Sequence, residues 1–273
     1  MRILDTHLHL IYPERFSYPW LSGAPALNKR WSVEDYFAEA VGLGIDSAVH
    51  MEVDVAEADM LGETEYVLGL PRILGAIAGC RPEHMNFVDQ IEQLSEHPHI
   101  KGVRRILHEV PDDLSQSDLF VENIRHLPDY NLSFDLCLRA DQLPIGMMLV
   151  QRAPDVEFIL DHCGVPDVAG KGLDPWRAYI TEFARLPNVV AKISGVMAYA
   201  GPNWTVDDLR PFVEHVIESF GWDRVVWGSD HPGVTRTGSL TRWVEATHQI
   251  IAGASESEKA KLLHANAERV YRV

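Results

Sequence analysis

Three short segments of this 273-residue chain place histidine or aspartate at the end of an apolar run. They are residues 5–9 (DTHLH), 160–164 (LDHCG) and 227–232 (WGSDHP). Imidazole and carboxylate groups can transfer protons or bind a divalent metal at neutral pH, and the apolar residues before them favour buried strands. The three segments therefore indicate an enzyme, and a hydrolytic one, provided that the fold brings them together.

His7 and His9 are two residues apart in a strand-like run, so their side chains should point to the same face. Asp5 continues this polar column in an otherwise apolar stretch. Two imidazoles on one strand can chelate a metal or polarise a substrate carbonyl. The alternative interpretation is a structural pair of histidines.

Asp230 ends the last strand-like run of the chain. A carboxylate at this place can act as a general base or as a metal ligand, and the alternative is a cap for the segment that follows. His162 is a further catalytic candidate that Asp161 would orient, or else a core histidine with a satisfied hydrogen bond. His231 would point away from Asp230 if the strand continued.

Several other apolar runs contain a charged side chain, and a desolvated charge without a partner is costly. Arg104 and Lys192 are cations of this kind, and Asp135 and Glu52 are acids. They could bind the oxygen atoms of a substrate, and structural ion pairs explain them about as well. The aromatic-rich connection 10–32 adds Trp20 as a substrate-binding candidate, in a segment that is a lid, a plug on the rim, or both.

These side chains need a scaffold, and the rest of the chain alternates strand-like and helix-like stretches. The strand-like runs are 2–9, 47–53, 73–80, 100–107, 132–138, 157–162, 189–194 and 224–228. The helical patterns are 33–42, 56–70, 86–96, 117–130, 143–153, 175–186, 206–220 and 239–252, with a last one at 257–270. The alternation predicts an α/β fold: a single (β/α)8 TIM barrel over residues 1–273, with a long loop after the first strand and an extra C-terminal helix. A doubly wound sheet is the main alternative, but no glycine-rich phosphate motif follows the first strand.

The composition narrows the class of partner. A formal net charge of −16 disfavours nucleic acid and anionic membranes. Three cysteines without a CxxC motif disfavour both a disulfide framework and a thiolate zinc site. The sequence shows neither a signal-peptide pattern nor an apolar run of the ~18 residues that a membrane span needs. We therefore expect a cytoplasmic protein that acts on a small molecule.

A series of motifs carries a family resemblance along the chain. They are Asp5–His9, Tyr18–Leu21, Lys101–Arg104, Phe134–Leu136, Leu160–Gly164, Lys192–Gly195, Phe220–Gly221, Gly228–Asp230 and Asn266–Tyr271. In this combination the chain resembles the amidohydrolase superfamily, and within it the amidohydrolase 2 group of predicted metal-dependent TIM-barrel hydrolases. The branch that it resembles contains sugar-acid lactonases of carbohydrate metabolism and lactonases for muconolactone-type and pyrone-dicarboxylate substrates.

The resemblance implies that the protein opens a lactone ring. Asp230 would activate the attacking water, and His7, His9 and His162 would polarise the carbonyl or stabilise the oxyanion. Arg104 and Lys192 would bind the oxygen atoms of the substrate, and Asp135, Trp20 and Glu52 are the remaining substrate-binding candidates. In this branch tryptophan often follows the last-strand aspartate, whereas this chain has His231, a difference that would alter the pocket.

The metal content is left open by the resemblance. Members with a binuclear site carry a carboxylated lysine or a glutamate on the fourth strand and a histidine on the fifth. Here the fourth strand offers Arg104 and the fifth offers Asp135, so a binuclear site is not expected. One divalent ion, zinc or manganese, on His7, His9 and Asp230 is one alternative, and metal-independent catalysis, as in some relatives, is the other. Barrels of this type often pair, so a homodimer is an alternative to a monomer.

Other functions compete with lactone hydrolysis. A metal-dependent decarboxylase would share the paired histidines and the last-strand aspartate, but such enzymes usually keep a histidine on the fifth strand. An amidase or deaminase, which hydrolyses a C–N bond, would lack the same metal ligands. A barrel that only binds a ligand would leave His7, His9, His162 and Asp230 unexplained. Lactone hydrolysis is therefore the favoured function.

Overall fold

The computed structural model describes residues 1–273 and forms a ring of eight parallel strands. The strands follow one another in chain order: β1 (Ile3–Leu8), β2 (Ile45–Met51), β3 (Ile73–Gly79), β4 (Ile100–Ile106), β5 (Ser133–Cys137), β6 (Phe158–Leu160), β7 (Val189–Ile193) and β8 (Val225–Trp227). Hydrogen bonds from His9 N to His231 O (2.8 Å) and from Asp230 N to His7 O (2.9 Å) join the segment after β8 to β1. The predicted (β/α)8 TIM barrel is confirmed.

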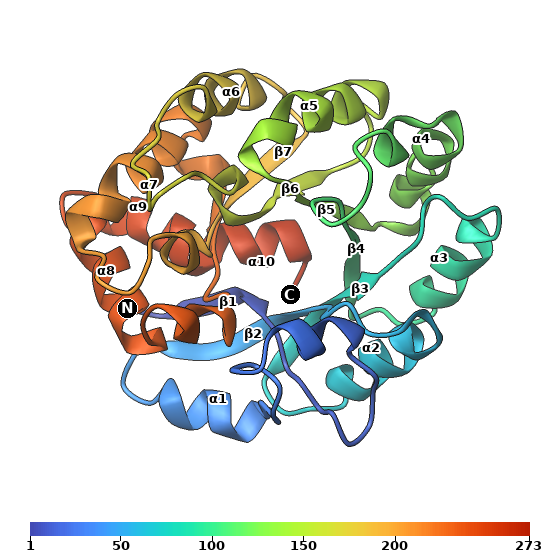
Figure 1. Ribbon diagram of the computed structural model, residues 1–273, viewed down its shortest axis with the longest axis horizontal. Coiled ribbons are helices and arrows are strands. Elements are labelled where there is room, and N and C mark those ends of the chain that lie inside the picture. The colour runs from blue at the N-terminus through green and yellow to red at the C-terminus, as the bar shows by residue number, and fades with distance from the viewer.

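Helices surround this ring, as Figure 1 shows. They are α1 (Val33–Glu39), α2 (Met60–Leu68), α3 (Phe87–Ser95), α4 (Asp118–Ile124), α5 (Leu143–Arg152), α6 (Trp176–Phe183), α7 (Val206–Phe220) and α8 (Leu240–Ile250), followed by α9 (Glu256–Ala260) and α10 (Asn266–Tyr271). The chain between α9 and α10 is a π-helical turn, Lys261–Ala265, so the predicted extra C-terminal helix is present with a local irregularity.

One predicted helix is shorter than its pattern suggested. Residues 117–130 form α4 and then a separate 3-10 turn, Leu127–Tyr130. Pro128 lies in that turn and has no N–H to donate to a preceding carbonyl, which ends the α-helical hydrogen-bonding pattern. The predicted strand 157–162 is also shorter, because β6 ends at Leu160 and the chain then turns sharply. That turn positions one of the candidate catalytic residues.

The C-terminal helix closes the inside of the barrel. A separate apolar cluster joins inward-facing strand residues, among them Leu4, Val49 and Val226, to Val270 and Tyr271 of α10. Figure 1 shows α10 across the centre of the ring. The larger apolar cluster lies between the strands and the surrounding helices. The barrel interior is therefore filled from one side, which leaves the opposite side, where the strands end, to form a cavity.

The long connection after β1 folds over the C-terminal ends of the first strands. Ile11 and Trp31 form an antiparallel bridge at its base. Its apolar residues, including Tyr18 and Leu21, pack against Val53 in the segment after β2. This connection thus covers the rim of the barrel beside the cavity. None of the helices is both long enough and apolar enough to cross a lipid bilayer.

Candidate active site

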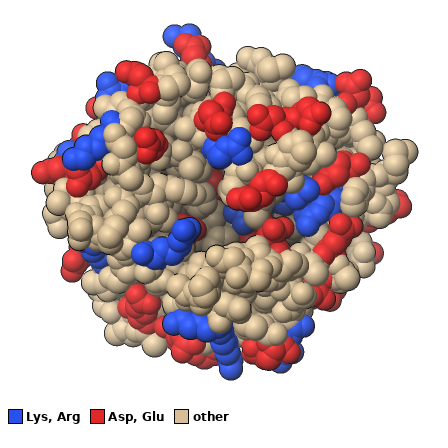
Figure 2. Space-filling view, in the orientation of Figure 1, with Lys and Arg blue, Asp and Glu red and all other residues tan.

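A cavity of about 640 Å³ opens at the C-terminal ends of the strands. Figure 2 shows the corresponding hollow at the centre of this face, with acidic and basic side chains around its rim. Five of the residues singled out in the sequence line the cavity: His9, Trp20, Arg104, His162 and Asp230. Parallel strands deliver their terminal residues to one face, and this geometry brings together segments that are more than 200 residues apart in the sequence.

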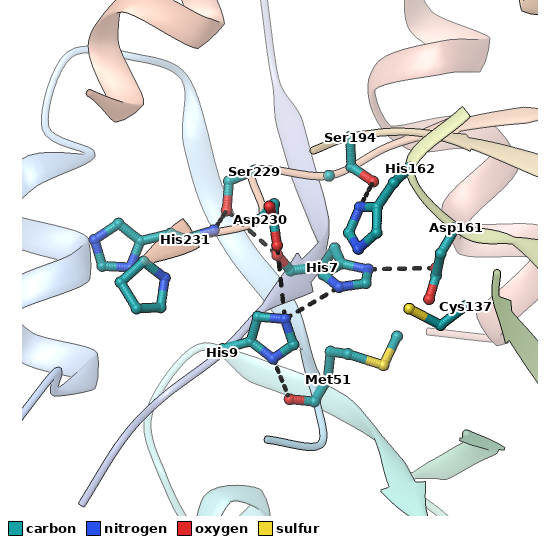
Figure 3. Close-up of polar contacts among 12 residues, drawn as sticks. His7, His9, Met51, Cys137, Asp161, His162, Ser194, Ser229, Asp230 and His231 are labelled. Atoms are coloured by element: carbon teal, nitrogen blue, oxygen red, sulfur yellow. Dashed lines mark hydrogen bonds and ion pairs between the residues drawn. The ribbon is translucent and has the colours of Figure 1, made fainter. Parts of the chain in front are cut away.

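His7 and His9 project from the end of β1 toward each other. Their Nε2 atoms are 3.2 Å apart, and the planes of the rings differ by 81°. His9 Nδ1 lies 3.0 Å from the carbonyl oxygen of Met51 and 3.1 Å from that of Glu52. Carbonyl oxygens only accept hydrogen bonds, so the Nδ1 of His9 carries the proton and its Nε2 presents a lone pair (Figure 3).

The other edge of His7 faces a carboxylate. Its Nδ1 is 3.4 Å from Asp161 Oδ1 and 3.3 Å from Lys192 Nζ. Its Nε2 is 3.4 Å from Arg104 Nη1, which can only donate, so the proton of a neutral His7 is on Nδ1, toward the carboxylate. Burial lowers the pKa of both His7 and His9 well below the usual range, so both rings are neutral. Two lone pairs thus face each other across 3.2 Å, with the guanidinium Nη1 of Arg104 3.4 Å from His7 Nε2.

Asp230 lies next to His9 in the cavity wall. Its Oδ1 is 3.7 Å from His9 Nε2, and 13% of its side chain is exposed, toward the cavity. Its backbone has a positive φ of 56°, which turns the chain out of the strand direction immediately after β8. Burial raises the pKa of Asp230 to about 8, and the neighbouring carboxylate of Asp161 adds to the effect.

His162 is carried by the turn that ends β6. His162, Cys163, Gly164 and Val165 all have positive φ, which is rare for side chains other than glycine and indicates local strain. The turn directs the His162 ring at His7, with 4.4 Å between the ring centroids. Ser194 Oγ is 3.0 Å from His162 Nδ1 and fixes the orientation of the ring. Burial lowers the pKa of His162 to about 3, so this ring is neutral as well.

Two glycines make room for these rings. A Cβ at Gly195, whose φ is +67°, would stand 2.4 Å from His162 Nδ1. A Cβ at Gly228 would stand 2.6 Å from the Cβ of His7. Both distances are far below van der Waals contact, so the absence of a side chain at these positions is a condition for the arrangement of the histidines.

Beneath the histidines lies a fully buried ionic cluster. Lys192 Nζ is 2.6 Å from Asp135 Oδ1 and 3.0 Å from Asp161 Oδ1. The ring of Tyr271, from α10, lies on its other side with 5.7 Å between Nζ and the ring centroid. The two carboxylates raise the pKa of Lys192 and keep it charged despite its burial. Both Asp161 Oδ1 (3.4 Å) and Lys192 Nζ (3.3 Å) connect this cluster to the Nδ1 of His7.

Arg104 connects that cluster to the cavity. Its Nε donates to Glu52 Oε1 at 2.6 Å and its Nη2 to the backbone oxygen of Glu52 at 2.8 Å. Its Nη1 lies 3.5 Å from Asp161 Oδ2 and 3.4 Å from His7 Nε2. The guanidinium is therefore oriented by Glu52 and held next to the paired histidines, where it also contributes to the cavity wall.

The structure separates the predicted substrate-binding residues into two groups. Arg104 and Trp20 line the cavity, and Trp20 is fixed there by a hydrogen bond from Nε1 to the backbone oxygen of Val53 (2.8 Å). Lys192, Asp135 and Glu52 are buried and face one another or Arg104 instead of the cavity. These three residues form the ion pairs that were the alternative interpretation of their charges.

Two other residues near the motifs point away from the cavity. Asp5 accepts hydrogen bonds from the backbone N–H groups of His7 (3.0 Å) and Ser229 (2.8 Å), and from the hydroxyl of Tyr36. It thus ties β1 to the end of β8. The prediction that Asp5 continues the polar column of the histidines was wrong. His231 points the other way from Asp230, as predicted, with its Nε2 3.4 Å from Glu39 Oε2.

Several cavity residues were not identified from the sequence. Cys137 Sγ lies 3.2 Å from His108 Nδ1, and both residues line the cavity. Cys137 ends β5 and His108 follows the end of β4, so both could have been predicted as cavity residues from their place at the end of a strand. Tyr199 and Arg236 also line the cavity, but they lie in 3-10 turns after β7 and β8, where no periodic pattern marks them.

The residues around the paired histidines fit a single divalent cation. His7, His9 and Asp230 each offer a ligand atom, and all three atoms lie within 4.8 Å of one another. His7, Asp161 and His162 form a second group of this kind, fully buried. Two nitrogens bound to one tetrahedral zinc ion at about 2.0–2.1 Å stand roughly 3.3 Å apart, close to the observed Nε2 separation. The donor set of two imidazoles and one carboxylate also leaves room for a further ligand.

Comparisons with known proteins agree with this architecture. The family model described as Amidohydrolase matches residues 4–273. An amidohydrolase from Burkholderia multivorans, solved with bound zinc, has a TM-score of 0.90 at 20% identity and is covered over 100% of both chains, a likeness that shows the fold. An amidohydrolase 2 protein from Bifidobacterium longum subsp. infantis has a TM-score of 0.78 at 26% identity, over 100% of this chain and 99% of its own.

Curated relatives are similar along the sequence as well. An L-fucono-1,5-lactonase of Burkholderia ambifaria is 29% identical over 67% of this chain and 65% of its own length. A 4-sulfomuconolactone hydrolase of Rhizobium radiobacter is 25% identical over 84% of this chain and 75% of its own. The uncharacterized protein y4mH of Sinorhizobium fredii is 30% identical over 99% of this chain and 98% of its own. With the family model matched over nearly its whole length, this chain belongs to the amidohydrolase family.

Proposed function

We propose that this protein hydrolyses a lactone, with Asp230 as the general base. The observation that carries the proposal is the placement of Asp230 beside the paired histidines, with its carboxylate directed into the cavity. A water between Asp230 and a bound lactone would give its proton to the carboxylate and attack the carbonyl carbon. The bond from that carbon to the ring oxygen then breaks, and the ring oxygen takes up the proton, which yields a hydroxy acid.

The names of the relatives support the same reaction. Two of the curated relatives are named as an L-fucono-1,5-lactonase and a 4-sulfomuconolactone hydrolase. Both names describe hydrolysis of the ester bond within a ring. Burial raises the pKa of Asp230 to about 8, which leaves the carboxyl group mostly protonated at neutral pH. A bound cation would shift it toward the ionised form that a general base requires.

We further propose that His7, His9 and Asp230 hold one divalent metal, with zinc as the first candidate. Support comes from the donor set, from the spacing of the two Nε2 atoms, and from the zinc found in the Burkholderia multivorans amidohydrolase. Such an ion would act as a Lewis acid toward the lactone carbonyl. Asp161 would keep the Nδ1 edge of His7 protonated and so keep its Nε2 free for the metal.

The remaining residues would bind and orient the substrate. His162 is neutral and fixed by Ser194, so an N–H on its Nε2 would donate to an oxygen of the lactone. Arg104 would donate to another oxygen from the cavity wall, and the indole of Trp20 would pack on the ring. Lys192, Asp135 and Glu52 would act through Asp161 and Arg104, as positioning residues.

The decisive experiment is an acid-release assay with a pH indicator. The panel contains L-fucono-1,5-lactone, galactono- and rhamnono-lactones, muconolactone and 2-pyrone-4,6-dicarboxylate. Each is tested with the purified protein as isolated, after chelation, and after addition of zinc or manganese. Acid release that disappears in the Asp230→Asn variant supports the proposal. Silence across the panel under every metal condition, combined with release of carbon dioxide from aromatic acids, would replace it with the decarboxylase alternative.

A further inference from the structure

We propose that the substrate is an anionic lactone, and that Arg236 together with Tyr199 forms the subsite for its carboxylate or a similar oxygen anion. This inference rests on the proposed lactone hydrolysis and specifies its substrate class. The subsite lies on the turns after β7 and β8, so it would bind a group that projects from the ring whose carbonyl faces Asp230. A neutral sugar lactone offers no group of this kind.

Most charged side chains that line the cavity have an ion-pair partner within the protein. Arg104 faces Glu52 at 2.6 Å, so this pair is internally balanced. At the mouth of the cavity, Glu109 faces His108 at 3.4 Å, and Asp54 faces Arg81 at 3.7 Å. Arg236 is an exposed residue that lines the cavity, and its guanidinium makes no hydrogen bond or ion pair with another residue. Of the two arginines that line the cavity, Arg236 is the one without an ion-pair partner in the protein.

A second unpartnered donor accompanies Arg236. The hydroxyl of Tyr199 makes no hydrogen bond within the protein, and the residue is partly buried in the cavity wall. A phenol is protonated at neutral pH, and burial raises the pKa of Tyr199 further, so its hydroxyl can donate to an acceptor in the cavity. A guanidinium and a hydroxyl that both donate match the two oxygen atoms of a carboxylate.

The two donors are held on segments that are tied together. Thr237 Oγ1, next to Arg236, donates to the backbone oxygen of Met197 at 2.6 Å. Trp204 Nε1 donates to the backbone oxygen of Thr237 at 3.1 Å. Val234 N also donates to the backbone oxygen of Asp230 at 2.9 Å, so the turn that carries Arg236 begins at the proposed general base. The anion subsite and the base are therefore parts of one short structural unit.

The first test is direct binding of a matched pair of probes that cannot be hydrolysed. Cyclopentylacetate mimics a lactone with a carboxymethyl group, and cyclopentylacetamide is its uncharged counterpart. By calorimetry we expect the wild-type protein to bind the acid roughly tenfold to a hundredfold more tightly than the amide, the usual effect of a hydrogen-bonded charge pair. Arg236→Gln should remove this preference, and Tyr199→Phe should reduce it.

The control is Arg177→Gln, which removes the same charge from an exposed arginine outside the cavity and should keep the preference. Circular dichroism checks that each variant is folded. Equal binding of the two probes by the wild-type protein, absence of binding of the acid, or an unchanged preference in Arg236→Gln overturns the inference. None of these results depends on catalysis, so the subsite is tested even if the proposed function fails.

The second test is kinetic and compares muconolactone with its methyl ester. If the inference holds, Arg236→Gln raises KM for the anionic lactone about tenfold or more and leaves that for the ester nearly unchanged. If only neutral sugar lactones are hydrolysed, and equally well by Arg236→Gln, lactone hydrolysis stands and the anionic substrate class is wrong. If no lactone is hydrolysed but the acid probe still depends on Arg236, the function is wrong and the anion subsite stands.

Discussion

The imidazoles of His7 and His9 meet Nε2 to Nε2 at 3.2 Å, while the Nδ1 edge of each ring is engaged by an acceptor on the far side. Neither ring can turn its protonated edge inward without breaking those contacts. Burial also opposes a proton shared between the two rings. In the metal site that we propose, these two nitrogens would be ligands already in place, and Asp230, 3.7 Å from His9, would be the third.

The first prediction is that the purified protein contains about one divalent ion per chain, and that His9→Ala lowers this content at least tenfold. The loss follows from removal of one of three protein ligands. Elemental analysis by mass spectrometry measures it directly. His97→Ala, at an exposed histidine that faces Glu65, is the control and should retain the metal. A wild-type protein that is free of metal and fully active would favour metal-independent catalysis.

The second prediction concerns Asp230→Asn. The amide keeps the shape of the side chain but cannot accept a proton, so kcat should fall by about 10²–10⁴-fold, the usual contribution of a general base. Circular dichroism should remain that of the wild type. Asp129→Asn, at a carboxylate that is 78% exposed, is the matched control and should leave kcat unchanged. An Asp230→Asn variant with more than about a tenth of wild-type turnover would remove Asp230 from the role of base.

The paired histidines and the last-strand aspartate could be predicted because strands obey a simple rule. Residues two apart share a face, and all parallel strands deliver their ends to one side of a barrel. His162 was identified by the same rule, but its orientation was not predictable. The chain leaves the strand at Asp161 and takes positive φ over the next four residues, a conformation that the side chains themselves disfavour.

The ion pairs between residues far apart in the chain could not be predicted from the sequence either. The sequence shows that Lys192 and Asp135 lie in apolar strands, but not that Nζ and Oδ1 meet at 2.6 Å. Two isolated buried charges and one ion pair look the same in a sequence. Tyr199 and Arg236 were missed for a different reason, because they lie in irregular turns where the position of a side chain depends on tertiary contacts.

The third prediction tests the buried cluster. Lys192→Met removes a fully buried cation and leaves Asp135 and Asp161 without it, so the free energy of unfolding should fall by about 3–5 kcal/mol. Urea denaturation provides the measurement. The double variant Lys192→Met/Asp135→Leu removes one of the stranded carboxylates and should recover part of the loss. A loss below about 1 kcal/mol in the single variant would mean that the cluster contributes little to stability.

The last prediction separates backbone strain from the orientation of His162. Gly195 and Gly201 both have positive φ, +67° and +75°, so alanine at either position should cost about 1–2 kcal/mol of stability. A Cβ at Gly195 would stand 2.4 Å from His162 Nδ1, whereas one at Gly201 would meet nothing within 4 Å. Gly195→Ala must therefore displace the imidazole and break its contact with Ser194, and a displacement of about 1 Å should lower kcat roughly a hundredfold.

Gly201→Ala is the control. It should lose similar stability and keep kcat within about twofold, since no cavity residue moves. Thermal denaturation and steady-state kinetics on both variants decide between the two effects. Equal loss of turnover in the two variants would mean that strain, and not the position of His162, limits catalysis.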